Sequence, residues 1–124
     1  MTVRRTAVMV VGLAPEQLPL GGLLDAGLDL EVSALADFEA AKRQLAIQIP
    51  DVLITALRLG PYNGLHLILR ARTYSPGVTT IVVAEADDPV LRHDAEELGA
   101  MFVVGPISAE HLQVALRTTA AGSA

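Results

Sequence analysis

The sequence predicts an α/β domain in which five parallel strands form one sheet between two layers of helices, a three-layer α/β/α sandwich. Two observations lead to this fold class. Short apolar runs alternate five times with segments of helical periodicity, and the connections between them are short. Short connections leave only right-handed crossovers between parallel strands, and these place helices on both faces of the sheet. The 124 residues suit one domain with one core.

The first third of the chain predicts two strands and two helices. Residues 7–11 form a compact apolar run that is typical of a buried strand, whereas residues 30–33 alternate apolar and polar side chains as an edge strand does. Residues 16–26 favour a helix, weakened by one proline and two glycines. A second helix is expected over residues 37–48, with Asp37 as its N-cap.

The middle of the chain predicts a strand, a turn, a helix and another strand. Residues 52–55 are an apolar strand, and the run Gly-Pro-Tyr-Asn-Gly at 60–64 is a dense turn signal. Residues 65–75 show helical spacing, and residues 80–84 form the next apolar strand.

The last third adds two helices and one strand. Asp88 followed by Pro89 is a strong helix start, because the carboxylate caps free N–H groups and proline suits the first helical position; this helix should end at Gly99. Residues 101–104 form the final strand, and Ser108 caps the last helix. We expect a domain over residues 1–120 and, over residues 121–124, a disordered tail or an artificial end of the expressed chain.

Composition excludes several functions. Fourteen acids against nine bases give a net charge of −5 with no basic cluster, so direct binding to nucleic acid is not expected. The absence of cysteine excludes disulfides, thiolate metal sites and cysteine nucleophiles. Apolar runs fall well short of the roughly 20 residues that span a bilayer. We therefore expect a cytoplasmic protein with no membrane contact.

Three stretches resemble, in order, the receiver domain of bacterial response regulators. PDVLITALRL at 50–59 and NGL at 63–65 are similar to the family's third strand and loop, "PD-apolar-DLRLP…DGL". IVVA at 81–84 resembles the fourth strand. LGA at 98–100 and FVVGP at 102–106 resemble "GA…YLVKP", one residue short before Gly105. The resemblance covers nearly the whole chain and implies a flavodoxin-like fold with strand order 2-1-3-4-5.

The same resemblance implies a pocket that has lost its chemistry. In the family, two acids after the first strand and an aspartate ending the third hold Mg²⁺, and that aspartate takes phosphate from a histidine kinase. A hydroxyl residue ends the fourth strand, and a lysine precedes the proline. The matching residues of this chain are Gly12, Leu13, Ala56, Ala84 and Gly105. The resemblance thus implies a degenerate receiver, or pseudo-receiver, without a phosphoacceptor.

Elementary chemistry leads to the same expectation. Mg²⁺ needs an oxygen shell with fixed carboxylates, and phosphoryl transfer needs a nucleophile and positive charge. The five side chains at the pocket positions offer neither. Glu85 is the one acid expected near this edge, since Asp87 and Asp88 are placed to cap a helix. His66, His93 and His111 lie on three different predicted helices, so they form no local metal pair. We expect no catalytic residue, no enzyme activity and no bound Mg²⁺ or other cofactor.

Our leading hypothesis is a phosphorylation-independent module of two-component or phosphorelay signalling that binds a protein partner or forms a homodimer. By analogy with receivers, its working surface is the helix from residue 88, the strand at residue 102 and the helix from residue 108. The candidate interface residues are Val90, Arg92, His93, Gln113 and Arg117. Phe102 matches the aromatic position that switches between buried and exposed in receivers, and the sequence leaves its orientation open.

The alternative is a ligand-sensing domain in which a small molecule occupies the apolar edge near Leu13, Ala56, Ala84 and Glu85. A cavity there would favour this function, whereas the simpler expectation is an edge closed by side chains. An enzyme ranks last, because no nucleophile, base and orienting partner can be assembled from the sequence.

Overall fold

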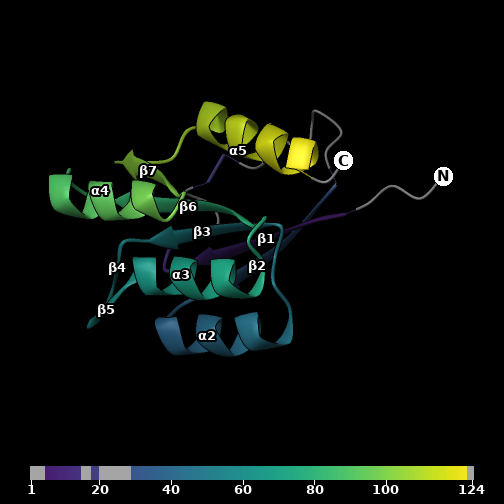
Figure 1. Ribbon diagram of the computed structural model, residues 1–124, viewed down its shortest axis with the longest axis horizontal. Coiled ribbons are helices and arrows are strands. Elements are labelled where there is room, and N and C mark those ends of the chain that lie inside the picture. Colours follow the sequence, from purple (N-terminus) through teal and green to yellow (C-terminus); the bar gives the residue numbers. More distant parts are fainter. Residues whose placement is uncertain (1–4, 15–17, 20–28, 123–124) are drawn as a thin grey trace.

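One five-stranded parallel sheet organises the chain (Figure 1). The computed structural model describes residues 5–14, 18–19 and 29–122, and of residues 117–122 only the helix that they form. The strands are β1 (Thr6–Val11), β2 (Leu30–Leu35), β3 (Val52–Ala56), β6 (Thr79–Ala84) and β7 (Met101–Val104). Their order in the sheet is β2-β1-β3-β6-β7, which is the predicted order 2-1-3-4-5 when these five strands are counted along the chain. The predicted fold class is confirmed.

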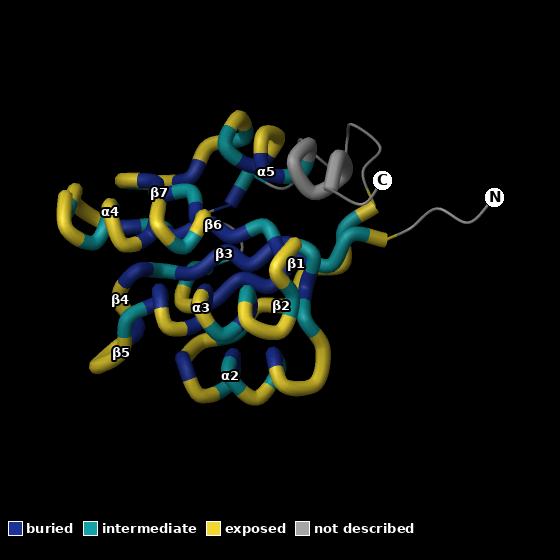
Figure 2. The backbone as a smooth tube through the Cα atoms, viewed as in Figure 1, coloured by how far each residue is buried: buried dark blue, intermediate teal, exposed yellow. Residues whose placement is uncertain are grey.

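Helices cover both faces of the sheet, and each face has its own apolar core. Side chains of α2 (Phe38–Ile47), α3 (Gly64–Tyr74) and α4 (Pro89–Glu97) join one cluster with alternate strand residues such as Met9 and Leu53. Side chains of α5 (Ala109–Gly122) join the cluster on the opposite face with Val8 and Ile54. Figure 2 shows the buried strands between these layers. Alternation along each strand therefore divides the apolar residues between two cores.

The sheet edges differ from its centre. β3 and β6 are almost wholly buried, whereas four successive residues of β2, Glu31 to Ala34, are exposed. The expected edge strand is confirmed, because β2 pairs with β1 alone.

Polar side chains fix the predicted helix starts. Asp37 accepts a hydrogen bond from the Ala40 N–H at 2.8 Å, and Asp88 accepts one from the Leu91 N–H at 3.1 Å. Both carboxylates thereby satisfy helix N–H groups that have no partner within the helix. Asn63 caps α3 in the same way, through the Leu65 N–H at 2.8 Å, although the sequence analysis had placed Asn63 only in a turn.

A small hairpin stands where the turn was expected. β4 (Arg58–Leu59) and β5 (Tyr62–Asn63) pair antiparallel around Gly60 and Pro61. The ring of Tyr62 stacks on Phe38 of α2, with ring centroids 4.4 Å apart and planes inclined by 13°. The hairpin thus joins the loop after β3 to the helical layer.

Two predictions concern residues at the limits of the described part of the chain. The helix expected at 16–26 lies almost entirely outside the described residues. α5 continues to Gly122, two residues beyond the expected domain end. Among the residues described, no helix is both long and apolar enough to cross a membrane.

Candidate functional site

The carboxyl ends of β1, β3, β6 and β7 meet around one cleft of about 820 Å³. All five positions that the resemblance singled out line this cleft: they are Gly12, Leu13, Ala56, Ala84 and Gly105. They come together because parallel strands end at the same edge of a sheet, where ligands of open α/β folds bind. The structure thus has an open cleft at this edge, where the sequence analysis expected side chains to close it.

Backbone geometry keeps two glycines at the cleft. Gly12 has φ of +71° and Gly105 has φ of +82°, conformations that side-chain-bearing residues rarely adopt. The Gly12 N–H donates to the Leu35 carbonyl at 2.9 Å, and the Gly105 N–H donates to the Ala84 carbonyl at 2.8 Å. These bonds hold both turns against neighbouring strands.

The cleft has apolar walls and a charged rim. Apolar side chains, among them Leu13, Leu18 and Ile107, line its interior. Arg58 and Glu85 are exposed at its border. The described lining therefore offers mainly apolar contact, together with the charged groups of Arg58, Glu85, Asp87 and Asp88.

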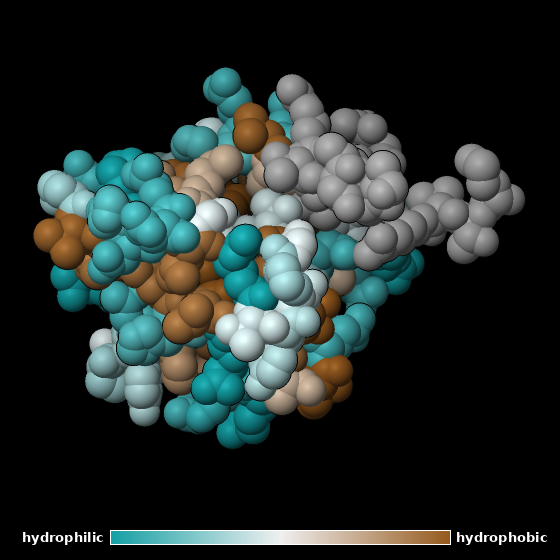
Figure 3. All heavy atoms as spheres, viewed as in Figure 1, coloured by the Kyte–Doolittle hydropathy of each residue, from teal (hydrophilic) through white to brown (hydrophobic). Residues whose placement is uncertain are grey.

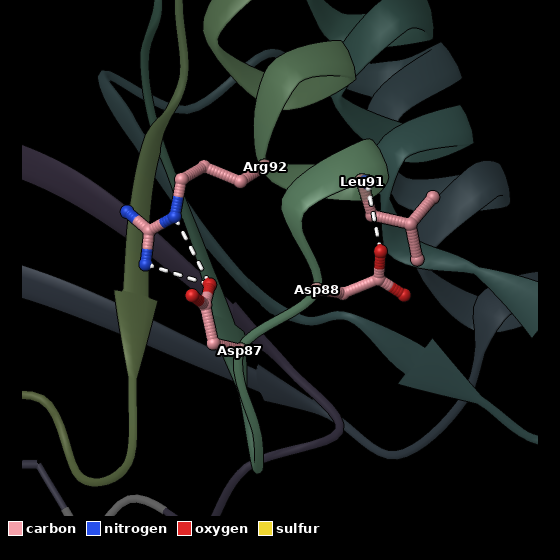
Figure 4. Close-up of polar contacts among 4 residues, drawn as sticks. All are labelled: Asp87, Asp88, Leu91 and Arg92. Carbon is pink, nitrogen blue, oxygen red and sulfur yellow. Dashed lines mark hydrogen bonds and ion pairs between the residues drawn. The ribbon is translucent and has the colours of Figure 1, made fainter.

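Two acids beside the cleft are engaged in other contacts (Figure 4). Asp87 Oδ1 accepts from Nε and Nη2 of Arg92 at 3.0 and 2.9 Å, and Asp88 caps α4 as described above. Among the described residues that line the cleft, Glu85 is thus the one carboxylate that makes neither of these contacts. Across the part of the chain that the structure describes, no three His, Cys, Asp or Glu side chains gather as a metal site requires.

The hydroxyl group of Thr55, the residue before Ala56, makes its contacts away from the cleft. Thr55 is fully buried, and its Oγ1 donates to the Ala56 carbonyl at 3.0 Å. A Cβ built on Gly64, at the start of α3, would lie 2.9 Å from this Oγ1. Thr55 therefore packs against α3 and is absent from the cleft lining, since successive side chains of a strand point to opposite faces of the sheet.

Phe102 lies inward, which answers a question that the sequence left open. Its side chain is 9% exposed, and the Arg92 guanidinium carbon lies 4.7 Å from the ring centroid. Arg92 therefore contacts both the aromatic ring and the Asp87 carboxylate. No sequence signal could have shown this cluster, because its members come from three different segments.

The candidate interface residues divide into different environments. Val90 is 70% exposed, Gln113 is exposed, and His93 lies 3.3 Å from Glu97. Arg92 contacts Phe102 and Asp87, as stated above. Arg117 belongs to α5, and its side chain is not described. Two further apolar residues, Val104 of β7 and Val114 of α5, are exposed and were missed by the sequence analysis. β7 is the edge strand between α4 and α5, so its outward side chains reach solvent.

Sequence comparison finds no matching family model and no matching curated protein. Solved structures do match. The signal receiver domain of the response regulator NarL from Mycobacterium tuberculosis has a TM-score of 0.70 at 18% identity, covering 95% of this chain and 98% of that one. The chemotaxis response regulator CheY4 of Vibrio cholerae gives 0.69 at 20%, covering 94% and 99%.

A response regulator receiver domain protein from Clostridium thermocellum has a TM-score of 0.75 at 18% identity, covering 92% of this chain and 93% of that one. Likeness at such identities concerns the fold. The chain therefore has the fold of response regulator receiver domains over nearly its whole length.

Proposed function

We propose that this chain is a regulatory module of two-component signalling that acts through protein contacts and does not accept a phosphoryl group. One observation carries the proposal: the five positions that line the cleft at the strand ends bear no carboxylate, hydroxyl or amine. A receiver fold that lacks a nucleophile can still bind protein partners through its surface. The amount of complex is then set by the concentration of the partner and its affinity.

The neighbouring acids do not replace the missing ones. Asp87 and Asp88 are engaged with Arg92 and with the first turn of α4, and moving either would cost those contacts. Glu85 alone supplies at most one fixed carboxylate, while Mg²⁺ with a phosphoryl group needs several coordinated oxygens and a nucleophile in line.

The face formed by α4, β7 and α5 is the proposed surface for a protein partner. Val90, Val104 and Val114 expose apolar area there, with exposed fractions of 70%, 41% and 44%. The exposed charged groups described around them are mainly acidic, including Glu96 and Glu110. Two copies of this face would bring like charges together, so a partner with an apolar and basic surface suits it best.

The proposal is tested by incubating the purified domain with Mg²⁺ and acetyl phosphate and then measuring its intact mass and its light scattering. A phosphorylatable receiver is the positive control in the same buffer. We expect no mass gain and no change in oligomeric state. We expect the same of Ala56→Asp, because one added carboxylate creates no metal site. A stable, stoichiometric gain of one phosphoryl group by the unmodified chain would overturn the proposal.

The cleft itself favours a second candidate, a sensor of small apolar molecules. Its apolar walls and volume of about 820 Å³ lie within the range of ligand sites. A neutral fluorescent probe, N-phenylnaphthylamine, tests this function. Saturable binding that is weakened in Ala56→Leu, where the larger side chain projects into the cleft, would support a sensor. Binding that is absent, or that Ala56→Leu leaves unchanged, would exclude this cleft as the site.

A further inference from the structure

A second hollow lies on the helical layer, between α2 and α3. It has a volume of about 400 Å³ and is lined by Phe38, His66, Leu69, Arg70, Thr73 and Tyr74. Leu69 and Tyr74 are 52% and 54% exposed, so both contribute apolar surface on neighbouring turns of one helix. The described residues that line the groove thus combine apolar side chains with Arg70 and His66, and they include no acid.

The charge of this region is opposite to that of the whole chain. Residues 52–84 contain no acid, although they carry Arg58, Arg70 and Arg72 in a protein of net charge −5. Arg72 donates to the Val78 carbonyl at 3.4 Å, whereas Arg70 forms no ion pair within the described residues. Arg70 is therefore a basic group at the groove for which the described residues supply no acidic partner.

Helix α4 shows the complementary pattern. The helix, residues 89–97, contains three acids and one arginine. Val90, Asp94 and Glu97 are exposed and spaced at i, i+4 and i+7, so they share one stripe of the helix. Val90 is 70% exposed, which makes it an apolar side chain projecting beside two carboxylates. A stripe of this kind matches an apolar groove with a basic border.

We propose that α4 of a second copy of this chain docks in the α2–α3 groove. Val90 of one copy enters the apolar groove of the other, and Asp94 and Glu97 face Arg70. The groove and α4 lie on the same side of the sheet, and Figure 3 shows apolar atoms over α3 and between α3 and α4. A two-fold axis that lies parallel to this face, in the plane of the contact, turns the faces of the two copies toward each other, so both contacts form at once and the dimer closes.

This inference rests on the proposed role as a protein-interaction module, and it names the partner as a second copy. It differs from pairing through α4, β7 and α5, where acids would face acids. The electrostatic part weakens with salt, because Asp94 and Glu97 are exposed and Arg70 is only partly buried. If the chain does not dimerise, the mass measurement with acetyl phosphate is unaffected. The two proposals can therefore fail separately.

The test is sedimentation equilibrium of the full chain over a range of protein and salt concentrations. We expect a dimer whose dissociation constant rises at least tenfold in Arg70→Glu and in Asp94→Lys. Arg43→Glu and Glu110→Lys make the same charge changes outside the groove and the stripe, and they should change it less than twofold. Circular dichroism spectra and melting curves show whether each variant remains folded.

Mixing the two impaired variants gives the sharpest result. In the mixed dimer, one contact pairs Arg70→Glu with Asp94→Lys and the other keeps the wild-type Arg70 and Asp94, so the mixture should regain a dimer with wild-type affinity. A chain that stays monomeric at high concentration overturns the inference and leaves the groove to another occupant. A dimer that survives both charge reversals but is lost in Val104→Asp overturns it too, because the contact then lies on the α4–β7–α5 face.

Discussion

Replacing Arg92 by alanine would test whether the contact between its guanidinium and the Phe102 ring stabilises the buried position of that ring. The substitution removes a guanidinium 4.7 Å from the ring centroid and its ion pair with Asp87 at 2.9 Å. A cation–π contact at a partly exposed site contributes about 0.5–1 kcal/mol. The ion pair adds little, because its side chains are 38% and 56% exposed.

We therefore expect Arg92→Ala to lower the free energy of unfolding by about 1 kcal/mol, which is roughly 3–6 °C in Tm for a domain of this size. Urea denaturation followed by circular dichroism measures the change. A double-mutant cycle with Phe102→Leu isolates the contact with the ring, and a coupling energy of about 0.5–1 kcal/mol is expected. Asp87→Asn serves as the control for the ion pair.

Two results would refute this reasoning. One is a coupling energy indistinguishable from zero, which would mean that Arg92 rests over the ring without stabilising it. The other is an unchanged environment of the Phe102 ring protons in the NMR spectrum of Arg92→Ala, since removal of the guanidinium should open that side of the ring to water.

Three further changes probe local structure. Gly64→Ala places a Cβ against the Ala56 carbonyl and should lower the free energy of unfolding in urea by more than about 2 kcal/mol. The control is Gly77→Ala, whose Cβ would meet nothing within 4 Å and which should change stability by less than about 0.5 kcal/mol. Equal effects of the two substitutions would contradict the steric argument. Ser108 Oγ accepts from the His111 N–H at 3.2 Å while His111 Nδ1 accepts from the Ser108 N–H at 3.1 Å, a reciprocal cap. Ser108→Ala should therefore lower the free energy of unfolding by about 1 kcal/mol. His111→Glu keeps the reciprocal pattern and should leave stability almost unchanged. A large loss of stability in His111→Glu would show that the imidazole has another role. Tyr62→Leu removes the stack on Phe38 and should lower stability by about 0.5–1 kcal/mol in thermal unfolding, and no loss would mean that the hairpin does not support α2.

The layered fold could be predicted because its signals are local. Apolar runs mark β3 and β6, and Asp37 and Asp88 mark helix starts, since a cap acts within one turn of its own residue. The gathering of the pocket positions followed from parallel strands alone, because their carboxyl ends share an edge.

Features that depend on two distant segments could not be predicted. The β4–β5 hairpin has only two residues in each strand, too few for any periodicity. The contact of Arg92 with Phe102 and the stack of Phe38 on Tyr62 join separate elements. The open cleft was missed because its volume depends on how far the strand ends stand apart, which residue types alone do not determine.

The left-handed turns at Gly12 and Gly105 bear on how this chain can change over evolutionary time. Any L-residue introduced there would enter a backbone conformation that costs roughly 1–2 kcal/mol. At position 12 it would also press on Leu59. A lineage that has settled on these two glycines would have to rebuild two loops before new side chains became tolerable. Under the proposed function, the loss of phosphoryl chemistry is then a one-way step, and selection acts on the surfaces that remain.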